Sequence, residues 1–138
     1  MKKIKLLAFL LLCVPMLWAR GTNDSSLEAD SISPVKKGGI ISAETAKKMM
    51  DKDASIILVD VRTKEEYEAG KIKKAVLLPY DQITEESTQK IIPSKDTKII
   101  VYCRSGRRSA IASESLRVLG YTAVYDMGGI GSWSYGIE

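Results

Sequence analysis

The chain contains no histidine, so it lacks the side chain that most often activates a nucleophile or binds zinc. It has only two cysteines, Cys13 and Cys103. These residues offer too few nitrogen and sulfur ligands for a zinc site, and we predict no metal and no cofactor. The longest apolar run is also shorter than the roughly 20 residues that a transmembrane helix requires, and Pro15 interrupts it.

The chain also lacks a strong excess of charge of either sign. The formal net charge of +4 includes Lys2, Lys3 and Lys5, which lie in a segment that looks removable. Without them, 18 basic residues face 17 acidic ones. A protein that binds nucleic acid through its backbone needs a sustained basic face, so we expect no nucleic-acid partner.

The N-terminus has the pattern of an export signal. The three lysines precede an apolar run over residues 6–18, and cleavage is expected after Ala19. Residues 20–39 are rich in Ser, Asp, Asn, Gly and Lys and predict a flexible linker, followed by one folded domain over residues 40–138. An exported, periplasmic protein is therefore expected. The alternative is a lipoprotein anchored at Cys13, although Leu12 precedes that cysteine where a small residue is usual.

Cleavage after Ala19 would leave Cys103 as the only cysteine, so no intramolecular disulfide could form. A lone cysteine is either an inert, buried apolar residue or a reactive one. The neighbours of Cys103 favour reactivity, because the sequence from residue 103 to 108 reads Cys-Arg-Ser-Gly-Arg-Arg. Such a thiol must also be reachable from solvent to act as a nucleophile.

From residue 40 onward, runs typical of strands alternate with runs typical of helices. This pattern predicts an α/β fold, with a mostly parallel central sheet flanked by helices on both faces. The predicted strands are residues 56–59, 75–78, 98–102 and 123–125. The predicted helices are residues 43–50, a short helix that begins with a Thr63 and Glu66 capping box and ends at Gly70, and residues 109–119.

This map places Cys103 at the carboxyl end of an interior strand, in a loop that runs into a helix N-terminus. Both positions favour anion binding in open α/β sheets. Gly106 allows the tight turn that would direct several backbone N–H groups to one point. Those amides and the charges of Arg104, Arg107 and Arg108 should lower the pKa of Cys103 and hold an anionic substrate over the sulfur.

The sequence resembles the rhodanese family of sulfurtransferases over about 100 residues. The motifs that carry the resemblance are Val59-Asp60-Val61-Arg62 with Glu65-Glu66-Tyr67, the stretch from Gly70 to Pro79, the loop from Cys103 to Arg108, and Met127-Gly128-Gly129-Ile130 with Trp133. The resemblance implies a small rhodanese-like domain. It also implies transfer of a sulfane sulfur from an anionic donor such as thiosulfate to cyanide or a thiol, through a persulfide on Cys103. An acceptor protein is a further candidate partner.

The resemblance also implies roles for single residues. The backbone amides from Arg104 to Arg108, including those of Ser105 and Gly106, would form the cradle, and the three arginines would attract the donor. Asp60 and Arg62 would support the loop, and Trp133 would line the mouth of the pocket or simply pack at the C-terminus.

Two departures from the family pattern bear on the site. Lysines occupy positions between Gly70 and Ala75 where relatives usually have a histidine and a glycine, and Leu77 stands where asparagine is frequent. Arg108 stands where some members have Thr or Ser, which changes the size and charge of the pocket.

Three alternative functions remain. A phosphatase or arsenate reductase would use a similar loop, but with five residues between cysteine and arginine, whereas four separate Cys103 from Arg108. A binding module without catalysis would usually lack the loop cysteine. A persulfide carrier that serves a partner protein would keep it.

Overall fold

The computed structural model describes residues 38–138. The expected export signal, the Cys13 lipidation site and residues 20–37 of the expected linker lie outside the described residues. The first strand, β1 (Gly38–Ile40), includes two residues that we expected to belong to the linker. Gly38 has a φ of 129°, and a Cβ there would lie 2.2 Å from the Val124 oxygen, so this start of the domain depends on glycine.

Five parallel strands form one sheet in the order β1-β5-β4-β2-β3. The other four strands are β2 (Ile57–Asp60), β3 (Val76–Leu77), β4 (Lys98–Cys103) and β5 (Ala123–Gly129). β4 lies between β2 and β5, and all its residues after Lys98 are buried. Its continuous β-branched run is what a strand covered on both faces requires.

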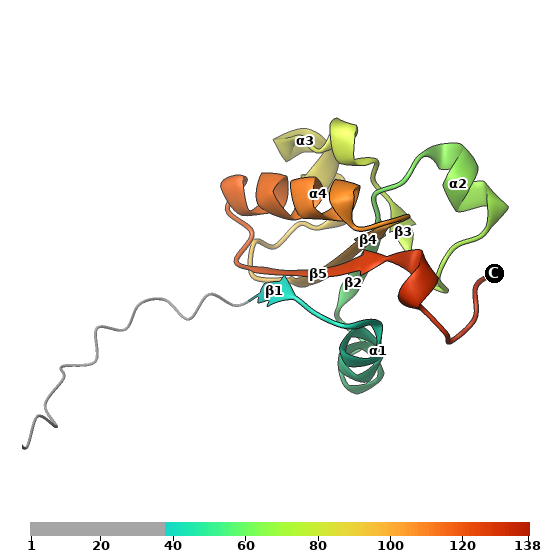
Figure 1. Ribbon diagram of the computed structural model, residues 1–138. Helices are drawn as coiled ribbons and strands as arrows, with labels where there is room; N and C mark the ends of the chain where they lie inside the picture. The colour runs from blue at the N-terminus through green and yellow to red at the C-terminus, as the bar shows by residue number, and fades with distance from the viewer. Residues whose placement is uncertain (1–37) are drawn as a thin grey trace, which may run out of the picture. The chain divides into compact units, whose positions relative to one another are not determined.

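Helices cover both faces of the sheet (Figure 1), which confirms the predicted fold class. α1 (Ala43–Lys52) lies on one face, with α3 (Glu85–Ile91) and α4 (Arg107–Val118) on the other. The short helix α2 (Lys64–Ala69) follows β2, and two 3-10 turns, η1 (Tyr80–Gln82) and η2 (Ile130–Ser132), follow β3 and β5.

Each face of the sheet has its own apolar cluster. Beneath α4, the buried side chains of Ala112 and Leu116 pack with Val101, Val124 and neighbouring residues. On the α1 face, the cluster is formed by Ala43, Ala46, Leu58, Ile72, Ala75, Ile100, Tyr102 and Met127. Cys103 belongs to the first cluster, so its side chain lies on the α4 face at the carboxyl end of β4.

Besides β1, three further features differ from the elements that the sequence predicted. α3 was not predicted, α4 begins two residues before the expected start at Ser109, and β5 continues four residues beyond Tyr125. The longer β5 carries a register shift, because Val101 pairs with Asp126 while Tyr102 pairs with Gly128. This irregularity brings Gly128 and Gly129 beside the end of β4, where the cysteine loop begins.

Candidate functional site

The candidate site is the loop that connects β4 to α4. Cys103 is the last residue of β4, and Gly106, at a φ of 99° in the left-handed region, is the N-cap residue of α4. This conformation favours glycine and makes the turn from strand to helix short. The N–H of Gly106 donates a hydrogen bond of 3.0 Å to the Cys103 sulfur. The sulfur therefore lies at the start of α4, where helical N–H groups have no intrahelical acceptor.

Gly129 supports the other side of this loop. A Cβ atom at Gly129 would lie 2.7 Å from the carbonyl oxygen of Arg104 and 3.2 Å from the Cα atom of Ser105. Such a backbone contact leaves no space for a side chain at this position. The glycines at the end of β5 therefore allow the cysteine loop to approach the sheet closely, and the Met-Gly-Gly-Ile motif has a steric role in the site.

The pKa of the Cys103 thiol reflects two opposing effects. Burial raises this pKa, but hydrogen bonds from the N–H and hydroxyl of Ser109 and from the N–H groups of Gly106 and Ser105 lower it by more. The net result is a pKa below the ordinary value of a thiol. Backbone dipoles and one hydroxyl are thus the leading groups that favour the thiolate.

Ser109 is the site residue that sequence reasoning missed. It is fully buried, and its hydroxyl donates a hydrogen bond of 2.9 Å to the Gly106 carbonyl oxygen. A hydroxyl has a single proton, so the Gly106 carbonyl and a Cys103 thiolate compete for it. A polar residue that begins the expected helix was the available signal, but an N-terminal serine is common and does not by itself indicate a contact with sulfur.

The structure buries Cys103 completely, with an exposed fraction of 0%. This differs from the expectation that the thiol is directly reachable from solvent. The physical reason is that the sulfur faces the ring of amides, while the next two residues, Arg104 and Ser105, are exposed above it. In this conformation of the loop, the sulfur presents no surface to a donor.

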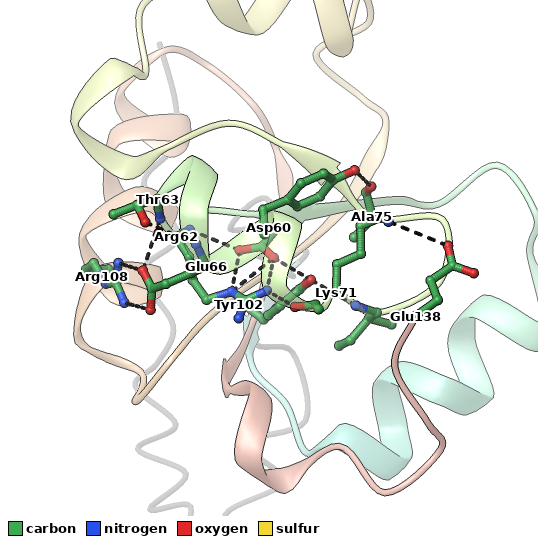
Figure 2. Close-up of polar contacts among 12 residues, drawn as sticks. Asp60, Arg62, Thr63, Glu66, Lys71, Ala75, Tyr102, Arg108 and Glu138 are labelled. Atoms are coloured by element: carbon green, nitrogen blue, oxygen red, sulfur yellow. Dashed lines mark hydrogen bonds and ion pairs between the residues drawn. The ribbon is translucent and has the colours of Figure 1, made fainter.

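The three arginines of the loop differ in their surroundings. Arg104 and Arg107 are exposed, and within residues 38–138 neither side chain forms an ion pair or a hydrogen bond. Arg108 is partly buried and forms a two-point ion pair with Glu66 of α2, at 2.6 and 2.9 Å (Figure 2). Two of the three expected anion-attracting side chains are thus available to a ligand, and the third is already paired.

Asp60 and Arg62 form a buried network with Tyr102 at the ends of the neighbouring strands β2 and β4 (Figure 2). Asp60 accepts hydrogen bonds from the Arg62 backbone N–H at 3.0 Å, from Arg62 Nη2 at 2.6 Å and from the Tyr102 hydroxyl at 2.6 Å. Asp60 and Tyr102 are also paired in the sheet. Because Tyr102 precedes Cys103, this network fixes the end of β4, consistent with the supporting role expected for Asp60 and Arg62.

Trp133 lines an open groove of about 580 Å³ rather than the sulfur cradle itself. The groove is also lined by Arg62, Glu66, Gly70, Ile130 and Ile137. The Trp133 ring packs edge-on against Tyr135 with 5.0 Å between ring centroids, and its Nε1–H donates to the Gly136 carbonyl oxygen at 3.0 Å. Trp133 therefore stands beside the site, on the side where Glu66 holds Arg108.

The parallel sheet and the cysteine loop that leads into a helix N-terminus define an α/β domain with a thiol at a position that favours anion binding. The model of the rhodanese-like domain matches residues 42–135, and the chain belongs to this family. The match includes the loop, the Asp60 and Arg62 pair, and Trp133.

The relatives that contain this domain differ in length and in the activity that their names state. The chain is 37% identical to a putative mitochondrial thiosulfate sulfurtransferase of Schizosaccharomyces pombe, over 59% of this chain and 63% of that protein. It is 32% identical to a tRNA uridine(34) hydroxylase of Erwinia tasmaniensis, over 80% of this chain but only 31% of that protein. The chain thus spans less than two thirds of either relative.

A solved structure of a rhodanese with anions from E. coli has the same fold. It superimposes with a TM-score of 0.57 at 30% sequence identity and covers 60% of this chain and 96% of that one. Together with the family match, this supports sulfurtransferase-type chemistry in general for the domain.

Proposed function

We propose that the protein is a thiosulfate sulfurtransferase of the rhodanese type, with Cys103 as the nucleophile and persulfide carrier. The observation that carries this proposal is the 3.0 Å hydrogen bond from the Gly106 N–H to the Cys103 sulfur. It places the thiol at the start of α4, in a ring of amides that favours the thiolate. The same amides would hold the negative charge of the outer sulfur once the persulfide has formed.

The reaction has two steps. The Cys103 thiolate attacks the outer sulfur of thiosulfate, the S–S bond of the donor breaks, and sulfite leaves with the electron pair. The acceptor, cyanide or a thiolate, then attacks the outer sulfur of the persulfide and releases the Cys103 thiolate. Each step passes one sulfur from one nucleophile to another and needs no oxidant, metal or imidazole base.

The name of the yeast relative supports thiosulfate as the donor, because that protein and this chain share most of the domain. The hydroxylase supports the domain but not its own named activity, since most of that longer protein has no counterpart in this chain. The short loop, with four residues between Cys103 and Arg108, favours a sulfur over the larger phosphoryl group of a phosphatase substrate.

The test is to treat the purified full-length protein with thiosulfate and to map the added mass by peptide mass spectrometry. We expect the mass of one sulfur atom on the peptide that contains Cys103, and its loss when cyanide is added. Cys103→Ser should abolish the adduct, while the matched variant Cys13→Ser should keep it. An unmodified Cys103 at saturating thiosulfate would contradict the proposal, and hydrolysis of an aryl phosphate would favour the phosphatase alternative.

A persulfide carrier is distinguished from a free-standing enzyme by the second step. An enzyme produces thiocyanate from cyanide over many turnovers, whereas a carrier forms the Cys103 persulfide once and releases its sulfur slowly to small acceptors. Thiocyanate formation with repeated turnover is the outcome that we expect. A single stoichiometric release would support the carrier instead.

We also propose that residues 1–19 direct export to the periplasm, from the three lysines and the apolar run that follows them. Within residues 38–138, no helix is long and apolar enough to cross a membrane. N-terminal sequencing of the protein recovered from cells should begin at Arg20. A lipid-modified Cys13 at the N-terminus would support the anchored form, and an intact Met1 would contradict both.

A further inference from the structure

The ion pair between Arg108 and Glu66 joins two parts of the molecule that are 42 positions apart in the sequence. Arg108 Nη1 lies 2.6 Å from Glu66 Oε2 and Nη2 lies 2.9 Å from Oε1, so both carboxylate oxygens are engaged. The exposed fractions of the two side chains are 23% and 26%. A two-point pair that is partly shielded from water holds its geometry better than an exposed contact.

Glu66 is held in place from its own helix as well. Its carboxylate accepts a hydrogen bond of 3.1 Å from the Thr63 N–H, and its own N–H donates to the Thr63 hydroxyl at 3.3 Å. This capping box fixes the carboxylate at the start of α2 (Figure 2). The glutamate is therefore a fixed partner for Arg108 and not a mobile surface charge.

The remaining charges of the loop set the context for this pair. Arg104 and Arg107 are exposed, whereas Arg108 is partly buried in the first turn of α4. It lies two residues after Gly106, whose N–H donates a hydrogen bond to the Cys103 sulfur. Arg108 thus belongs to the same short turn as the sulfur, so we expect its charge to act on a ligand there. The Glu66 carboxylate, paired with Arg108 through both of its oxygens, opposes that charge.

We propose that Glu66 is a specificity-determining residue, which neutralises Arg108 and so weakens the capture of doubly charged donors relative to singly charged or neutral ones. This inference rests on the proposed function, because it concerns the donor that reacts with Cys103. Its physical basis is that the attraction of an added positive charge scales with the charge of the ligand. A free Arg108 would help a dianion most and would leave an uncharged reagent unaffected.

The proposal differs from a purely structural role for the pair in the pattern of variant effects. If the pair only tied α2 to α4, loss of either partner would slow all donors alike. If charge is the cause, loss of Glu66 and loss of Arg108 have opposite effects on a dianion. The double variant restores the original net charge, so its preference between donors should be close to that of the wild type.

The kinetic experiment compares thiosulfate, which carries two negative charges, with benzenethiosulfonate, which carries one. Relative to the wild-type full-length chain, Glu66→Gln should raise kcat/KM about tenfold for thiosulfate and about threefold for benzenethiosulfonate, the sizes expected for one added charge in a partly screened site. Arg108→Ala leaves the Glu66 charge unpaired, so it should lower kcat/KM about tenfold for thiosulfate and about threefold for benzenethiosulfonate. Glu66→Gln combined with Arg108→Ala should give a ratio between donors close to that of the wild type.

The matched control is Glu68→Gln, which removes the same charge from the same helix. Glu68 pairs with the exposed Lys64 at 3.1 Å and does not contact Arg108. We expect the ratio between the two donors to stay within the error of the wild type. Far-ultraviolet circular dichroism and thermal melting of each variant establish that the proteins compared are folded.

A second measurement is independent of sulfur transfer. Alkylation of Cys103 by iodoacetate, a monoanion, and by iodoacetamide, which is neutral, is followed on the Cys103 peptide. Glu66→Gln should raise the ratio of the two rates about threefold, and Arg108→Ala should lower it. Both reagents alkylate the same sulfur, so differences in access and in thiol pKa affect the two rates equally. A change in the ratio of the rates therefore reports the effect of charge alone.

The possible outcomes separate the two proposals. If Cys103 is alkylated but forms no persulfide with either donor, the proposed function fails and the alkylation ratio alone decides this inference. If persulfide forms but Glu66→Gln changes neither the ratio of kcat/KM between the two donors nor the ratio of the two alkylation rates, the inference is wrong and the proposed function stands. A thiol that reacts with none of the four reagents overturns both.

Discussion

The Tyr102 hydroxyl donates a hydrogen bond of 2.6 Å to Asp60 Oδ2 and accepts one of 3.2 Å from the Ile72 N–H. Tyr102 is fully buried, and burial followed by its hydrogen bond to Asp60 raises its pKa far above the ordinary range of a phenol. The hydroxyl therefore stays protonated and acts as a fixed donor. It connects the β4 residue directly before Cys103 to the neighbouring strand β2.

We predict that Tyr102→Phe lowers the free energy of unfolding by about 1–3 kcal/mol, because a carboxylate and a backbone N–H both lose a buried partner. The measurement is urea denaturation at neutral pH. Tyr121→Phe is the matched control, since that hydroxyl donates only to the Ile92 carbonyl oxygen at 2.7 Å. A loss in Tyr102→Phe that is no larger than in the control would contradict the network as the anchor of β4.

Local patterns predicted the parts of the fold that local interactions determine. The buried strand β4 was expected at residues 98–102 and is observed as Lys98–Cys103, because a β-branched run covered on both faces has few alternatives. The capping box of Thr63 and Glu66 is observed as predicted. The early start of α4 was not predicted, because Gly106 serves as its N-cap through backbone conformation and has no capping side chain. α3 was missed because its one buried residue is Thr88, so the segment shows no apolar periodicity.

The site was predictable in its position but not in its electrostatics. A cysteine at the end of an interior strand, followed by glycine and a helix, places the sulfur among amides whatever the rest of the sequence is. The partner of Arg108 lies 42 positions away, and nothing near Arg108 indicates that Glu66 would meet it. Long-range pairing of this kind depends on where the fold places α2 relative to α4, and a pattern within one segment carries no information about it.

Lys74 is the only residue other than glycine with a positive φ among residues 38–138, at 68°. It is the third residue of a turn closed by a 3.0 Å hydrogen bond from the Ala75 N–H to the Ile72 carbonyl oxygen, a position that favours glycine. We predict that Lys74→Gly raises the free energy of unfolding by about 1 kcal/mol, because the left-handed conformation costs a side-chain-bearing residue about that much.

Urea denaturation checks this prediction, with Lys73→Gly as the control. Lys73 is also exposed in the same turn but has no positive φ. Lys73→Gly should lower the free energy of unfolding by about 0.5 kcal/mol, because glycine has more conformational freedom than lysine in the unfolded chain. Equal effects of the two substitutions would show that the backbone at Lys74 is not strained.

The pair of Glu66 and Arg108 makes the free energy of unfolding depend on pH in the acid range. The hydrogen bond from Arg108 lowers the pKa of Glu66 from 4.5 to about 2. A carboxyl whose pKa is lower in the folded state contributes stability that is fully present above pH 4.5 and is lost as the pH falls toward 2. We therefore predict that Glu66→Gln is less stable than the wild type at pH 6 and that the difference shrinks between pH 4.5 and 2.

Urea denaturation at a series of pH values from 6 to 2.5 measures this difference. Glu68→Gln, on the same helix, should track the wild type more closely across the series, because its exposed pair with Lys64 contributes little. A gap between Glu66→Gln and the wild type that stays constant with pH would mean that the carboxylate charge is not what stabilises the contact.

The Ser109 hydroxyl is one of the groups that lower the pKa of Cys103, against the raising effect of burial. Ser109→Ala removes this hydroxyl and keeps the backbone N–H, so we predict that the thiol pKa rises toward its ordinary value. At neutral pH the thiolate fraction then falls, and alkylation of Cys103 by iodoacetamide slows. Above the new pKa the rates of variant and wild type should converge, because both thiols are then ionised.

The pH dependence of the alkylation rate at the Cys103 peptide gives this pKa. Ser113→Ala is the control, because Ser113 lies one turn further along α4, is also buried, and its hydroxyl has no hydrogen-bond partner among the described residues. Its loss should leave the thiol pKa unchanged and should not lower the stability, since it removes an unpaired buried polar atom. If Ser109→Ala and Ser113→Ala titrate alike, the hydroxyl does not contribute, and the amides of the loop alone hold the thiolate.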